Sequence, residues 1–175
     1  IVSLEQCKTA EEIGFLSKEL KFKDIVSEEY LLSNNYFNDK EFINNGFETT
    51  ETVLLKTSDS NNVIENALQY SKENNIPIEK LTAVIANNTG RLVTDIIKNK
   101  NLKNLIVFGG DTLIGILKNI GIKYIVPVKE ILSGVVFTKV ILENNDFINI
   151  ITKAGGFGDK NLIKEIKYFF NTRNN

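Results

Sequence analysis

Apolar residues in this chain fall either into short continuous runs or at helical spacing. The continuous runs predict strands at 53–57, 105–108, 134–142 and 147–152. Spacing of three or four residues predicts helices at about 62–74, 112–120 and 160–170, and a helical region from Pro77 past Ile96 that is interrupted at 87–90. Predicted strands and helices alternate in the first part of the chain, and several predicted strands follow one another in the last part. This order predicts an α/β fold with a mixed, mostly parallel sheet sandwiched by helices.

Other segments carry weaker patterns. A capping box at Thr9–Glu12 predicts the start of a helix whose apolar face continues to Leu20. Residues 22–26 and 122–128 are interpreted as strands, and 28–46 as irregular or partly helical. Gly121 is expected to end the preceding helix in a left-handed conformation.

Composition narrows the classes of function. The chain of 175 residues and 19.7 kDa fits one domain spanning 1–175. Its 21 basic and 22 acidic residues give a net charge of −1, and they form no concentrated basic stretch, so no nucleic-acid or membrane partner is expected. Cys7 is the single cysteine and no apolar run approaches the roughly 20 residues of a membrane span, which favours a cytoplasmic location. Small molecules are the expected partners.

The chain has no histidine, which excludes histidine-dependent hydrolases and histidine zinc sites. A hard cation such as Mg²⁺, held by carboxylates and by the phosphates of a substrate, remains open. The chain begins at Ile1 and contains no methionine, so we expect it to be a piece of a longer polypeptide.

Two glycine-rich turns join a predicted strand to a predicted helix. Helix N-termini present unpaired N–H groups and a positive dipole end, and glycine lets a ligand approach the backbone. The turns therefore predict phosphate binding, with Lys153 as a helping cation. The alternative is two tight corners, with Asp111 as a helix N-cap and Lys153 as a solvated lysine at a strand end. The candidate nucleotide-binding residues are Gly109, Gly110, Asp111, Thr112, Lys153, Gly155, Gly156 and Gly158.

Three motifs in order, Gly109–Thr112, Glu130–Val136 and Lys153–Asp159, resemble the C-terminal nucleotide-binding domain of the four-carbon acid sugar kinases. The resemblance implies that ATP, with Mg²⁺, binds between this domain and an N-terminal sugar-acid domain that this chain does not contain. It also implies transfer of the γ-phosphoryl group to a hydroxyl of threonate, erythronate or an oxo-tetronate. No catalytic residue is assigned to this chain, because the resemblance places the base in the missing domain.

Two segments depart from the family pattern. The family's Gly-Ser stretch is replaced by Ser3–Gln6, and its Pro-Gly-Val-Pro turn by Ser133–Val136. These changes keep a second hypothesis open, a non-catalytic ligand-binding module that keeps the fold without the nucleotide site. A dinucleotide-binding dehydrogenase domain is a third, weaker alternative, because no Gly-x-Gly-x-x-Gly follows an early strand. The sequence leaves a homodimer open.

Overall fold

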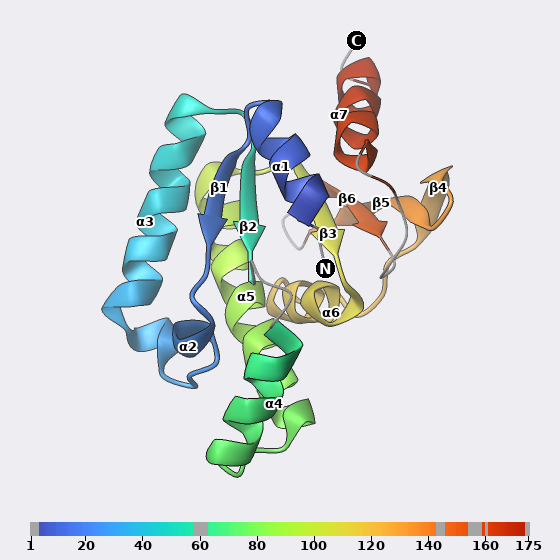
Figure 1. Ribbon diagram of the computed structural model, residues 1–175. Coiled ribbons are helices and arrows are strands. Elements are labelled where there is room, and N and C mark those ends of the chain that lie inside the picture. The colour runs from blue at the N-terminus through green and yellow to red at the C-terminus, as the bar shows by residue number, and fades with distance from the viewer. Residues whose placement is uncertain (1–3, 58–62, 143–145, 154–158, 160, 174–175) are drawn as a thin grey trace.

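The computed structural model describes residues 4–57, 63–142, 146–153, 159 and 161–173 (Figure 1). Helices and strands alternate along most of the chain. The first half contains α1 (Leu4–Glu12), β1 (Leu16–Glu19), α2 (Phe22–Ile25), the 3-10 helix η1 (Tyr30–Leu32), α3 (Asn34–Thr49), β2 (Val53–Lys56) and α4 (Val63–Glu73). The second half contains α5 (Ile78–Lys100), β3 (Asn104–Phe108), α6 (Gly110–Asn119), β4 (Pro127–Leu132), β5 (Val135–Ile141), β6 (Phe147–Lys153) and α7 (Leu162–Arg173).

The described strands form two sheets. Strands β1 and β2 pair in parallel, and β3, β6, β5 and β4 follow one another in a second sheet. In that sheet β3 and β6 are parallel, whereas β5 runs antiparallel to both of its neighbours. The predicted α/β fold with a mixed sheet is therefore confirmed. No helix in the described ranges is both long and apolar enough to cross a membrane.

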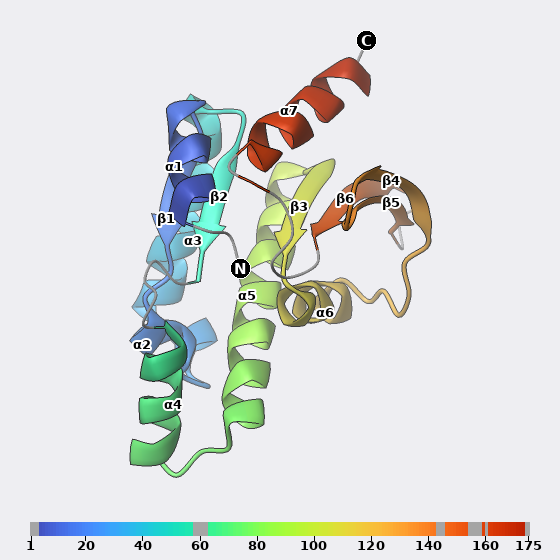
Figure 2. The same cartoon turned by 45° about the vertical axis from the view of Figure 1, so that its right-hand side comes forward.

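Helices cover both faces of these sheets (Figures 1 and 2). Leu54 of β2 packs with apolar residues of α1 and α7, whereas its neighbours Val53 and Leu55 pack against the cluster formed with α3 and α5. Helix α5 is shared by two cores, because Leu92 and Ile96 belong to one cluster and the adjacent residues 93 and 97 belong to the other. This central helix therefore fixes the sheets relative to each other.

The predicted interruption of α5 at 87–90 is wrong, because the helix runs without a break from Ile78 to Lys100. Asn88 is buried and its Nδ2 donates hydrogen bonds of 2.8 Å to the carbonyl oxygens of Ile25 and Ser27. Gly90 lies where α6 crosses α5. These residues have polar and small side chains because of distant tertiary contacts, not because the helix ends there.

The predicted N-terminal helix and the strand at 22–26 are also wrong. The helix at this end is Leu4–Glu12, so the residues taken as a cap lie in its last turns. Gly14 follows with φ of +87°, a left-handed conformation that ends the helix and favours glycine. The chain then enters β1, and residues 22–25 form a short helix.

The later predictions agree better with the structure. The strands predicted at 53–57, 105–108, 134–142 and 147–152 and the helices at 62–74, 112–120 and 160–170 are confirmed with shifted ends. Gly121, with φ of +80°, follows the end of α6 as expected. The strand placed at 122–128 is displaced, because β4 begins at Pro127.

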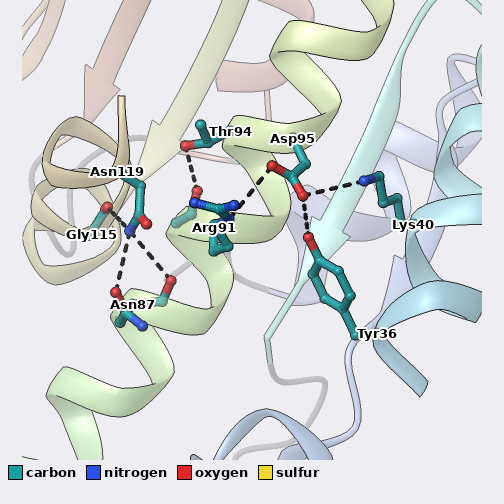
Figure 3. Close-up of polar contacts among 9 residues, drawn as sticks. Tyr36, Lys40, Asn87, Arg91, Thr94, Asp95, Gly115 and Asn119 are labelled. Atoms are coloured by element: carbon teal, nitrogen blue, oxygen red, sulfur yellow. Dashed lines mark hydrogen bonds and ion pairs between the residues drawn. The ribbon is translucent and has the colours of Figure 1, made fainter. Parts of the chain in front are cut away.

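A charged cluster joins α3 to α5 (Figure 3). The Tyr36 hydroxyl donates a hydrogen bond to Asp95, and the Lys40 ammonium lies 3.2 Å from the same carboxylate oxygen. Arg91 approaches the other oxygen at 3.6 Å. Burial raises the pKa of the Asp95 carboxyl, but the Tyr36 hydrogen bond and the two cations outweigh burial and hold this pKa below its ordinary value.

We expect Asp95→Asn to lower the free energy of unfolding by about 1–2 kcal/mol at pH 7, because the variant loses charge-assisted hydrogen bonds. A carboxyl with a lowered folded pKa stabilises the fold above its unfolded pKa, here 3.8, and loses this contribution as pH falls through the folded pKa. The difference from wild type, measured by urea denaturation, should therefore be smaller at acidic pH. Glu41→Gln at an exposed site of α3 is the control. An Asp95→Asn effect that does not change with pH would contradict this account.

Candidate functional site

The turn from β3 into α6 presents backbone N–H groups at the end of a strand. Gly109 precedes the helix with φ of +105° and ψ of +134°, a conformation that L residues rarely adopt. The first intrahelical bond is donated by Leu113 N to Gly109 O at 3.2 Å. The N–H groups of Gly110, Asp111 and Thr112 therefore lie at the open N-terminus of α6, where anions are favoured.

Asp111 is not the N-cap of α6, although the sequence suggested that role. Gly109 occupies the cap position, without a side-chain hydrogen bond, and Asp111 is the second residue of the helix. Its exposed carboxylate borders a hollow between α5 and α6, whereas the next side chain, Thr112, borders a cavity between β2 and β3. The two residues therefore face different sides of the same helix end.

Parallel pairing brings the second predicted segment to this turn. Phe108 and Lys153 are register partners at the ends of β3 and β6, and Gly109 N donates to Lys153 O at 3.5 Å. The structure therefore places Lys153 beside the β3–α6 turn, as the sequence predicts. The other candidates, at 155, 156 and 158, lie outside the described residues.

Lys153 is buried, with 5% of its surface exposed, so it is not the solvated lysine of the alternative interpretation. Its Nζ lies 5.3 Å from the centroid of the Phe108 ring. Burial lowers the pKa of Lys153, because the charged ammonium loses hydration. An anion at this sheet edge would favour the charged form of the lysine.

The surroundings leave space for such a ligand. A Cβ added to Gly110 would meet no atom of the described residues within 4 Å. Thr112 and Phe108 also border the separate cavity between β2 and β3, whose lining does not include Gly109, Gly110 or Lys153. Mg²⁺ commonly binds through one or two carboxylates together with substrate phosphates, and the exposed carboxylate at this helix end, that of Asp111, borders the hollow between α5 and α6. The open N-terminus of α6 can thus accept an anionic group such as a phosphate.

Sequence reasoning missed two residues near this region. Gln6 of α1 is buried, and its Nε2 donates a hydrogen bond of 3.1 Å to the carbonyl oxygen of Asp159. This bond ties the start of α1 to the segment that leads into α7. Thr89 of α5 lies on the cavity wall with 3% of its surface exposed, and its hydroxyl has no hydrogen-bond partner among the described residues. Its position in Asn87–Thr89 suggested a helix break instead.

Comparisons with known proteins agree with this architecture. A domain of unknown function (DUF1537) from Bordetella bronchiseptica, a domain-swapped dimer with bound citrate, superposes with a TM-score of 0.62 and 13% identity over 93% of this chain and 36% of that one. A putative tRNA synthase from Salmonella typhimurium LT2 superposes with a TM-score of 0.63 and 16% identity over 94% of this chain and 37% of that one. At these identities the likeness shows the fold. No curated protein matches the chain.

The chain spans little more than a third of these solved structures. A family model, described as the nucleotide-binding C-terminal domain, matches residues 2–163. The match covers the β3–α6 turn, Lys153 and the start of α7. The chain therefore belongs to the nucleotide-binding C-terminal domain family.

Proposed function

We propose that this domain binds ATP, with Mg²⁺, by its phosphates at the ends of β3 and β6. The observation that carries the proposal is the pairing of Phe108 with Lys153, which sets a buried lysine beside the glycine turn at the α6 N-terminus. Three N–H groups and the strand end that carries the lysine then lie at a single sheet edge. Ligands of α/β sheets commonly bind at the carboxyl ends of the strands, which is where these groups lie.

We further propose that the domain is the nucleotide-binding half of a kinase for a four-carbon sugar acid of the threonate, erythronate or oxo-tetronate type. The three ordered motifs and membership of the family support this proposal. Phosphoryl transfer depends chiefly on positioning and charge stabilisation, which N–H groups and a lysine supply, and bound Mg²⁺ would neutralise further phosphate charge. The acceptor site and the base belong to a second domain. A homodimer is the assembly to test, since the Bordetella protein is a domain-swapped dimer.

Calorimetric titration tests the binding proposal. We expect MgATP and MgADP to bind saturably and at least about 10-fold more tightly than adenosine, because the contacts are to phosphates. Binding of adenosine as tight as that of ATP would contradict the phosphate site. Undetectable binding of every nucleotide at millimolar concentration would favour the non-catalytic module instead. For the kinase, the readout is release of ADP by the full-length protein with each sugar acid.

A further inference from the structure

Strands β2 and β3 face each other across a cavity without pairing. In the described part of the chain, β2 pairs with β1 alone and β3 with β6 alone. The cavity of about 570 Å³ is lined by both strands along their whole length, and by no residue of β1 or β6. It therefore lies between the free edges of the two sheets. Figure 2 shows β2 and β3 pointing in the same direction.

The hydrogen-bond registers show which backbone groups face this cavity. Leu16 N donates to Thr52 O at 3.1 Å and Leu20 N to Lys56 O at 2.8 Å, so even-numbered residues of β2 bond to β1. The N–H and C=O groups of Val53 and Leu55 must then point to the other edge.

In β3 the pattern is reversed. Lys103 O accepts from Asn149 N at 2.8 Å, and Gly109 N donates to Lys153 O at 3.5 Å, so odd-numbered residues bond to β6. Ile106 and Phe108 therefore turn their backbone groups toward β2. Two rows of donors and acceptors, each repeating every second residue, line opposite walls of one cavity.

The side chains of both strands are those of interior strands. Residues 53–55 of β2 and 105–108 of β3 are apolar on both faces, a pattern typical of parallel strands with neighbours on each side. Edge strands more often carry charges or prolines that prevent further pairing. Helices cover the cavity on both faces, with Val93 and Thr89 of α5 on one wall and Ile163 of α7 on another.

We propose that this cavity takes one β-strand, an extended apolar segment that runs parallel to β2 and β3 and joins the two sheets into one. Its source is the polypeptide that enters α1. Helix α1 starts at the level where β2 and β3 end, runs back beside the strands and leads into β1 (Figures 1 and 2). A strand on the N-terminal side of α1, parallel to β2 and β3, completes a β-α-β unit. The solved relatives have chain length beyond the part matched here, enough for such a segment.

Amide hydrogen exchange of the full-length protein and of the 175-residue chain tests this proposal. In the full-length protein the N–H groups of Leu55 and Ile106 should exchange as slowly as those of Leu54 and Val107, which bond to β1 and β6 and serve as controls within the same strands. In the shorter chain Leu55 and Ile106 should exchange on the order of 100-fold faster than these controls.

Fast exchange at Leu55 and Ile106 in the full-length protein would overturn the proposal. A native polypeptide in which no segment precedes α1 would also overturn it. Protection that rises with protein concentration would assign the strand to a second copy, and protection that requires ATP would assign the cavity to the nucleotide; either result contradicts the proposed occupant. The nucleotide titration and the exchange measurement are independent, so failure of the proposed nucleotide binding can be distinguished from failure of the proposed strand insertion.

Discussion

Gly90→Ala is expected to destabilise the protein by about 3 kcal/mol or to prevent folding, because α5 and α6 cross in backbone contact at this residue. A Cβ on Gly90 would lie 2.3 Å from the carbonyl oxygen of Gly115, and one on Gly115 would lie 2.1 Å from that of Ala86. The clashing atoms are backbone, so no side-chain rotation relieves them. Urea denaturation measures the loss.

Gly110→Ala is the matched control. Its added Cβ meets no atom within 4 Å in the part of the chain that the structure describes, and the residue begins α6, where alanine has the better helix propensity. The free energy of unfolding should therefore stay the same or rise by up to about 1 kcal/mol. If Gly90→Ala were as stable as this control, the close crossing would be refuted. The crossing also positions the N-terminus of α6, which is part of the proposed phosphate site.

Elements determined by local sequence patterns could be predicted, whereas those determined by distant contacts could not. The strands at 105–108 and 147–152 were predictable, because continuous apolar runs reflect burial on both faces. Strand β1 was not, since Leu16–Glu19 has no strand pattern and is held by pairing with β2. Asn88 resembled a helix breaker because its partners, Ile25 and Ser27, are 63 and 61 residues away.

The candidate site follows the same division. Glycines and a lysine at strand ends predicted a shared sheet edge, and the pairing of Phe108 with Lys153 agrees with that. The burial of Lys153 was not predictable, because it depends on the packing of separate segments. The cavity between β2 and β3 could not be predicted either, because apolar patterns identify strands but do not give their order in a sheet.

A buried lysine at a phosphate site has opposing effects on stability and on binding. Without an anion, burial of the ammonium costs free energy, which is why the pKa of Lys153 is lowered. A bound phosphate recovers part of that cost by pairing with the charge. At the proposed phosphate site, a bound phosphate would therefore favour the charged lysine over the neutral one.

Lys153→Met is expected to weaken MgATP binding by about 10- to 100-fold, because the variant loses the ammonium that would pair with the phosphates. Methionine keeps the length of the side chain without its charge. Lys164→Met, at an exposed position of α7, is the control and should leave the affinity unchanged. Calorimetry measures the affinities, and urea denaturation checks that both variants are folded. Wild-type affinity should also fall as pH rises through the lowered pKa of Lys153, and the variant should lack this dependence. Unchanged affinity in Lys153→Met would show that this lysine does not contribute to nucleotide binding.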